Sequence, residues 1–230
     1  MEFDQRGRIA MKKIIFVTGT DTGVGKTVLT GLLLAHLRGE GCDALAMKPF
    51  CSGGRGDARL LLGLQKGCLT LNEVNPYYYD KPVTPAAAPN PVAFKDVVSR
   101  ISALSNRCET LLIEGAGGLL SPLGKNYTAR ELISELNCQT IIVSRNSLGT
   151  INHTLLTVEA MRSVAVKQLE IVLMRAEKPD PSSPTNEKLL RQRLGEILIF
   201  SLPKLKFQRI SPREIENSAT FLKKVLARLL

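Results

Sequence analysis

The chain has 230 residues, of which 44% are hydrophobic and 23% charged, and its formal net charge is +10. This composition is typical of a globular protein with a packed core and excludes an intrinsically disordered chain. The length is near the upper limit for a single core, and no Gly-, Ser- or charge-rich linker divides it. We therefore expect one domain over residues 11–230, preceded by a disordered extension at residues 1–10.

The basic residues are scattered along the chain and form only short pairs such as Lys12-Lys13 and Lys223-Lys224. Aromatic residues do not alternate with them as they do in surfaces that stack bases, so we expect neither nucleic acid nor a membrane as partner. No apolar run approaches the roughly 20 residues that span a bilayer, and residues 1–6 lack a secretory apolar region. The five cysteines form no Cys-x-x-Cys pair and no Cys/His cluster, which indicates reduced thiols in a cytoplasmic protein.

Short apolar runs rich in β-branched residues alternate along the chain with amphipathic stretches. Such continuous runs are typical of parallel strands covered on both faces. We expect strands at 13–18, 44–48, 110–114, 140–144, 169–174 and 196–200. We expect helices at 26–38, 57–65, 91–105, 128–136, 150–162, 186–194 and 212–229. This order predicts an α/β fold of the P-loop NTPase type, with a doubly wound, mainly parallel sheet flanked by helices and ligands at the carboxyl ends of the strands.

The first strand leads directly into a glycine-containing turn that opens a helix, which is the context of a phosphate-binding loop. Residues 19–27 read Gly-Thr-Asp-Thr-Gly-Val-Gly-Lys-Thr, a variant in which the first glycine stands one position early. We expect backbone N–H groups to surround phosphate oxygens, Lys26 to reach the β- and γ-phosphates, and the Thr27 hydroxyl to bind Mg²⁺. The expected nucleotide contacts of this segment are Gly23, Val24, Gly25, Lys26, Thr27 and Val28.

Three charged residues lie at the ends of the second and third strands or shortly after them. Lys48 ends the strand at 44–48, where it would face the phosphate loop. Asp57 opens the next helix, either as a plain N-cap or as a magnesium ligand, and we favour the metal. Glu114 ends an otherwise apolar strand, where a carboxylate is costly to desolvate without a cation, so we expect it to bind Mg²⁺ too. The turn that follows Glu114 is expected to contact the nucleotide through Gly115, Ala116 and Gly117.

Several separated segments resemble dethiobiotin synthases, in the same order, over most of residues 11–175. They are Val17-Thr18-Gly19-Thr20-Asp21-Thr22 with Val24-Gly25-Lys26-Thr27, Lys48-Pro49 with Ser52-Gly53, Asn75-Pro76-Tyr77 with Pro85, Glu114-Gly115-Ala116-Gly117-Gly118 with Pro122-Leu123, and Leu148-Gly149 with Ile151-Asn152-His153. A phosphate loop alone is shared by many ATPases, whereas this set of segments is not.

The resemblance implies carboxylation and ring closure of 7,8-diaminononanoate. One substrate amine takes up CO₂ to form a carbamate, ATP phosphorylates the carbamate, and the second amine closes the ureido ring of dethiobiotin. By position, Lys48 would stabilise the carbamate and the developing phosphoryl charge, with Lys26 on the phosphate side. Ser52 would hydrogen-bond the diamine or carbamate. Mg²⁺ would lie among Thr27, Asp57 and Glu114.

The resemblance further implies a homodimer with its substrate site near the two-fold interface, where residues 148–153 would lie. His153 by itself we expect to be a packed or surface histidine. At Arg175 the family pattern has an asparagine that reads adenine. Arginine has hydrogen-bond donors but no acceptor, so the base preference stays open. Gly23 and Ser201 also stand where the family can have an acidic residue.

Two other functions use the same phosphate loop. One is a related amide-forming ligase that acts on another acid, and the other is a partitioning-type ATPase. Partitioning ATPases usually carry an additional lysine early in the loop, whereas residues 19–21 here are Gly, Thr and Asp, which disfavours that class. Lys48-Pro49 with Ser52-Gly53, and Asn75-Pro76-Tyr77, favour the diamine substrate over another acid.

Overall fold

A computed structural model describes residues 12–164, 166–176, 178, 180–205, 207 and 209–230; the extension expected at residues 1–10 lies outside them. The strands are β1 (Lys13–Gly19), β2 (Ala44–Met47), β3 (Phe50–Ser52), β4 (Tyr77–Tyr79), β5 (Thr110–Glu114), β6 (Pro122–Gly124), β7 (Tyr127–Thr128), β8 (Gln139–Asn146), β9 (Gln168–Arg175) and β10 (Leu198–Leu202). The helices are α1 (Lys26–Gly39), α2 (Gly56–Leu64), α3 (Leu71–Val74), the 3₁₀ turn η1 (Pro85–Ala87), α4 (Phe94–Ser105), α5 (Ala129–Leu136), α6 (Thr150–Arg162), α7 (Ser183–Leu194), α8 (Pro212–Phe221) and α9 (Lys223–Leu226).

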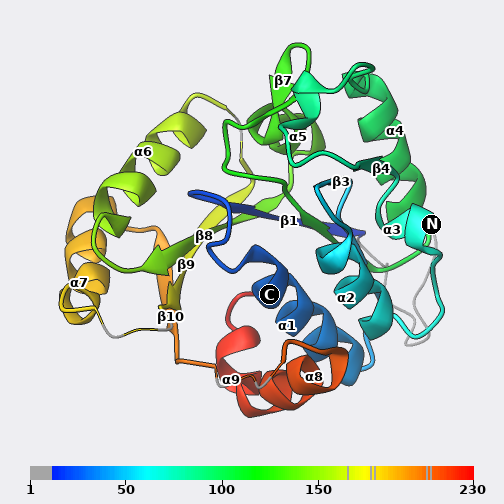
Figure 1. Cartoon of the computed structure of the whole chain (residues 1–230). Helices are drawn as coiled ribbons and strands as arrows, with labels where there is room; N and C mark the ends of the chain where they lie inside the picture. The colour runs from blue at the N-terminus through cyan, green and yellow to red at the C-terminus, as the bar shows by residue number, and fades with distance from the viewer. Residues whose placement is uncertain (1–11, 165, 177, 179, 206, 208) are drawn as a thin grey trace.

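The main sheet has six strands in the order β10-β9-β8-β1-β5-β2, and every pair is parallel. Its helices lie on both faces, with α4, α5, α6 and α7 on one side and α1, α8 and α9 on the other (Figure 1). All six expected strands belong to this sheet, so the predicted doubly wound fold is confirmed. The carboxyl ends of β1, β2, β5 and β8 therefore meet along one edge, where ligands bind in such folds.

A single cluster of buried hydrophobic side chains, drawn from both faces of the sheet, forms the core of the described residues. Among these residues, no helix combines the length and the hydropathy needed to cross a bilayer. All five cysteines are free, as expected from their spacing.

Short elements are where the expected and observed structures differ. The strands β3 and β4 pair in parallel as a separate two-stranded sheet, and β6 and β7 pair as an antiparallel one. Strands of two or three residues are too short to give a periodic pattern. The helix expected at 212–229 is also divided, because it is interrupted at Leu222 between α8 and α9. That break buries Leu222 and Leu226, and both segments contact α1.

A buried carboxylate lies in β9, which is the second strand of the sheet. Glu170 is 1% exposed, and its oxygens accept hydrogen bonds from Gln139 (Nε2 to Oε2, 2.8 Å) and from Gln168. Burial raises the pKa of Glu170, and the hydrogen bonds from Gln139 and Gln168 and the charge of Lys13 offset only part of that rise. The folded chain thus favours the protonated form of Glu170 more than the unfolded chain does.

We expect Glu170→Gln to remove a loss of stability that the wild-type chain suffers as pH rises. The unfolded chain ionises Glu170 near its ordinary pKa of 4.5, before the folded chain does, so folding stability falls as pH rises from there through the raised pKa. Urea unfolding at pH 5 and pH 8 measures the difference. The exposed Glu196→Gln is the matched control, and equal pH slopes for wild type and Glu170→Gln would contradict this expectation.

Candidate active site

The phosphate loop begins where β1 ends, and its backbone needs glycine at two positions. Gly23 and Gly25 have φ angles of 70° and 105°, in the left-handed region that other residues rarely adopt. A Cβ on Gly25 would also lie 3.0 Å from Cγ of Met174 in β9. The helix α1 starts at Lys26 with no side chain capping its first N–H groups, so these donors are available to an anion.

The side chain of Lys26 reaches back across the phosphate loop. The side chain is 6% exposed, and its Nζ donates to the carbonyl oxygen of Asp21 at 2.8 Å. Burial and, to a smaller extent, the positive charge of Lys48 together lower the pKa of Lys26 to about 8, against the opposing charges of nearby carboxylates. The Lys26 and Lys48 ammonium groups are thus close enough for their charges to interact, which favours an anionic ligand near them.

Lys48 follows β2 directly and is paired with two carboxylates. Its Nζ lies 2.5 Å from Oε1 of Glu114 and 2.9 Å from Oδ2 of Asp57. Burial alone would lower the pKa of Lys48, but the charges and hydrogen bonds of Glu114 and Asp57 outweigh it and raise the pKa above its ordinary value. The lysine is therefore held as a buried cation.

Glu114 ends β5 with a side chain that is 0% exposed. Its Oε1 accepts from Lys48 and from the Thr27 hydroxyl at 2.6 Å, whereas its buried Oε2 has no hydrogen-bond partner among the described residues. An unpaired buried carboxylate oxygen is costly. Oxygen atoms of Thr27, Glu114 and Asp57 are the ligands that Mg²⁺ prefers, so the three residues expected to bind the metal fit it.

Asp57 takes the role of an acid in the site rather than of an N-cap. The N-cap of α2 is Arg55, and Asp57 stands in the first helical turn with its carboxylate on Lys48. Burial raises the pKa of Asp57, but the charge of Lys48 and hydrogen bonds from Lys48 and Thr27 lower it by more. The alternative that Asp57 is a plain N-cap is wrong.

The other expected residues come from β3, from the turn after β5 and from the end of β9. Ser52 ends β3 and is half-buried. The turn after Glu114 passes beside the phosphate loop, because the N–H of Gly115 donates to the Val17 carbonyl at 2.9 Å and a Cβ on Gly118 would lie 3.2 Å from the Thr20 carbonyl oxygen. Arg175 is exposed at the end of β9, opposite Asn146 of β8.

Sequence reasoning missed Arg145, which is exposed near the end of β8. Its Nη2 donates to the carbonyl oxygen of Gly23 at 2.6 Å, so the guanidinium braces the tip of the phosphate loop. Ser144, the preceding residue, links the loop to α6 through hydroxyl groups, 3.3 Å from Thr20 and 2.7 Å from Thr150. These contacts have no local sequence signal. The pairs Arg145–Gly23 and Ser144–Thr20 each join residues more than 100 positions apart, and the Ser144–Thr150 pair belongs to no motif.

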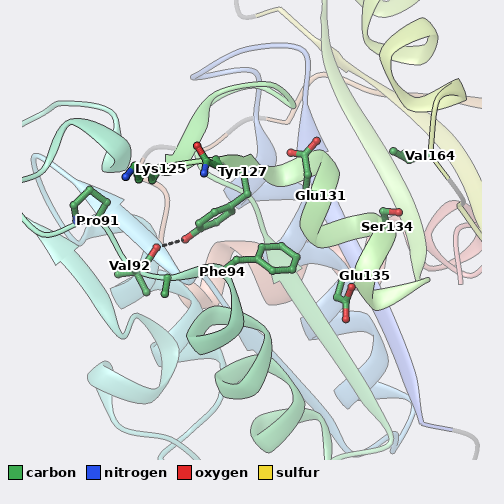
Figure 2. Close-up of a pocket in the computed structure, with 11 residues that line it drawn as sticks. Pro91, Val92, Phe94, Lys125, Tyr127, Glu131, Ser134, Glu135 and Val164 are labelled. Atoms are coloured by element: carbon green, nitrogen blue, oxygen red, sulfur yellow. Dashed lines mark hydrogen bonds between the residues drawn. The ribbon is translucent and has the colours of Figure 1, made fainter.

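A separate cavity of about 670 Å³ lies between the start of α4, the β6–β7 hairpin and α5. Figure 2 shows Tyr127 at its centre, with the Tyr127 hydroxyl donating to the Val92 carbonyl at 3.0 Å. The Phe94 ring lies edge-on to Tyr127 with centroids 5.2 Å apart, and Glu131 and Glu135 of α5 face the same space. None of the lining residues is an expected site residue, so this cavity is distinct from the phosphate loop and its carboxylates.

Comparison with known proteins identifies the family. A family model described as an AAA domain matches residues 13–207. An ATP-dependent dethiobiotin synthetase of Anaeromyxobacter sp. (strain Fw109-5) is 43% identical over 181 residues, which cover 75% of this chain and 81% of the relative. The chain belongs to the dethiobiotin synthetase family. A further dethiobiotin synthetase, from Bacillus velezensis, is 36% identical over 88% of this chain and 90% of its own length.

Solved structures resemble this dethiobiotin synthetase family member in fold alone. A pNOB8 ParA bound to nonspecific DNA superposes with a TM-score of 0.59 at 11% identity, covering 95% of this chain and 98% of that one. A putative plasmid partition protein from Borrelia burgdorferi B31, bound to AMPPNP, gives a TM-score of 0.53 at 15% identity, covering 92% and 98%. At these identities the likeness carries no argument for a partitioning function.

Proposed function

We propose that this member of the dethiobiotin synthetase family uses ATP and Mg²⁺ to carboxylate 7,8-diaminononanoate with CO₂ and close the ureido ring of dethiobiotin. The observation that carries this proposal is the buried cation Lys48 directly after β2, which is held by Glu114 and whose charge acts on Lys26. A phosphate loop needs only its own lysine to bind a nucleotide. A second buried ammonium beside it suits a reaction in which a second anion, the carbamate, meets the γ-phosphate.

The chain's own residues would act by positioning and by charge. The N–H groups of the loop from Gly23 to Val28 would hold the phosphates, and Lys26 would follow the transferring phosphoryl group. Lys48 would bind the carbamate oxygens, with Ser52 as a hydrogen-bond partner of the diamine. Because the substrate supplies both amines, no protein nucleophile is needed.

The proposed metal ligands are Thr27, Asp57 and Glu114. Mg²⁺ held there would neutralise charge on the phosphate groups. The unpaired Oε2 of Glu114 supports this assignment, because a buried carboxylate with a free oxygen suits a cation. The turn of Gly115, Ala116 and Gly117 would border the nucleotide, as would Arg175 at the end of β9.

We also propose that the chain works as a homodimer in the cytoplasm, as one domain over residues 11–230, without nucleic acid or membrane partners. Two apolar side chains at α6 support the dimer, since Leu148 is 84% exposed and Leu156 is 62% exposed. The segment 148–153 would then lie near the partner's substrate. His153 is exposed at this position.

The test incubates the purified protein with 7,8-diaminononanoate, bicarbonate, Mg²⁺ and ATP, and measures dethiobiotin and ADP by mass spectrometry. Parallel reactions with GTP and CTP report the base preference, which Arg175 leaves open. Omission of bicarbonate is the control, because a ligase acting on another acid would not depend on it. Absence of dethiobiotin with all three nucleotides would overturn the proposal and leave that related ligase as the alternative.

A further inference from the structure

We infer, on the basis of the proposed magnesium site, that the Lys48 ammonium is the resident cation of this site and that the metal must displace it. Displacement would move the ammonium from Glu114 and Asp57 to the side where Lys26 and the phosphates lie. Lys48 would then become available to the carbamate only once the metal is in place.

The ammonium contacts two of the three proposed metal ligands and is linked to the third, Thr27, through Glu114. Its Nζ lies 2.5 Å from Glu114 Oε1 and 2.9 Å from Asp57 Oδ2, and the Thr27 hydroxyl lies 2.6 Å from the same Glu114 oxygen. Mg²⁺ bonds carboxylate oxygens at about 2.0–2.1 Å. A Mg²⁺ ion bonded to Glu114 Oε1 and Asp57 Oδ2 would lie within a few ångströms of the ammonium that these oxygens now hold, where two cations repel strongly in a buried site.

The burial of Glu114 explains why the protein needs a cation there before the metal arrives. A carboxylate with 0% exposure and no compensating charge would be strongly destabilising. Lys48 supplies the positive charge to Oε1, but it leaves Oε2 without a partner. A single ammonium therefore satisfies the site only in part, which leaves a reason for a divalent ion to replace it.

The main chain of Lys48 is fixed, so the exchange needs only its side chain to move. Its N–H donates to the Val74 carbonyl at 2.8 Å, and its carbonyl accepts from Asn75 Nδ2 at 2.9 Å. Asn75 is itself held by Arg55, whose Nε donates to Asn75 Oδ1 at 3.0 Å. In contrast, Asp57 has a half-exposed side chain and can follow either cation.

Metal affinity in the absence of nucleotide is the first test. We expect Lys48→Met to bind Mn²⁺, used as the probe for Mg²⁺, at least tenfold more tightly than the wild type by electron paramagnetic resonance titration, because no ammonium has to be displaced. The control Lys223→Met removes an exposed lysine that pairs with Glu40 and should leave the affinity unchanged. Equal affinities of wild type and Lys48→Met would overturn the inference.

A second measurement uses the wild-type protein, in case Lys48→Met folds poorly. The ¹⁵Nζ resonance of Lys48 should move on titration with Mg²⁺ in the direction in which it moves in Glu114→Gln, where the ion pair with Glu114 is removed and the one with Asp57 remains. A resonance that stays unchanged while Mg²⁺ binds would overturn displacement and place the metal on Oε2 beside the lysine. Absence of Mn²⁺ binding even with ATP would instead overturn the proposed metal site itself, whereas dethiobiotin formation reports separately on the proposed reaction.

Discussion

Lys48→Met is expected to lower kcat for dethiobiotin formation by about 10²–10³-fold, while the KM for ATP changes little. The proposed role of Lys48 is to stabilise negative charge that develops between the carbamate and the phosphoryl group, and a buried donor of this kind typically contributes a factor of about 10²–10³. In the proposed site the nucleotide itself would be held mainly by the phosphate loop. Steady-state rates at saturating Mg²⁺ measure the effect.

Methionine keeps most of the volume of the buried lysine but lacks its charge, so the stability of the variant has to be measured together with its activity. Without a cation, the buried Glu114 would cost the fold about 3–5 kcal/mol, so metal-free samples should unfold at lower urea concentrations. Lys223→Met again serves as the surface control. A Lys48→Met enzyme with near-normal kcat would show that the carbamate lies elsewhere.

Lys26→Met should have the second large effect, with kcat/KM for ATP lowered by about 10²–10³. The Nζ of Lys26 reaches across the loop to the Asp21 carbonyl, which a bound phosphate would replace as its partner. Its loss should therefore weaken ATP binding and slow phosphoryl transfer together, unlike the loss of Lys48. Isothermal titration with ATP, followed by steady-state kinetics, separates the two effects.

The matched control for Lys26 is Lys13→Met, a half-buried lysine at the opposite end of β1. Removing it changes the net charge by the same amount but leaves the loop untouched. If Lys26→Met retained wild-type affinity and rate, the loop would not hold the transferred phosphate as proposed.

The parts of the site that could be predicted from sequence are those carried by local pattern. The strand, glycine turn and helix around Lys26 are contiguous, and Glu114 is an acid at the end of an apolar run, so both stood out. The pairing of Lys48 with Glu114 could not be predicted, because it depends on the register of two strands that are distant in the chain. Met47 lies opposite Ile113, which brings Lys48, the residue after β2, level with Glu114, the last residue of β5.

Other features could not be predicted from the sequence because they have no periodicity or motif. The strands β3 and β4 are three residues each, and only their pairing, with Phe50 opposite Tyr77, identifies them. Arg145 directly follows the strand expected at 140–144, and its bond to Gly23 forms only because β8 lies beside β1. Asp57 had two local explanations, and the helix start at Gly56 excluded one of them.

Asn75 also bears on attempts to redesign the acceptor specificity of this chain. Its amide donates to the carbonyls of Lys48 and Pro49, on the stretch that leads to Ser52. Under the proposed role of Ser52 as a partner of the diamine, position 52 is the one to vary for diamines of other lengths, while Asn75 keeps the main chain of Lys48 in place. In a library that also randomised position 75, a variant could lose activity because Lys48 is misplaced, and this loss could not be told apart from a change in substrate selectivity. We would therefore keep Asn75 unchanged.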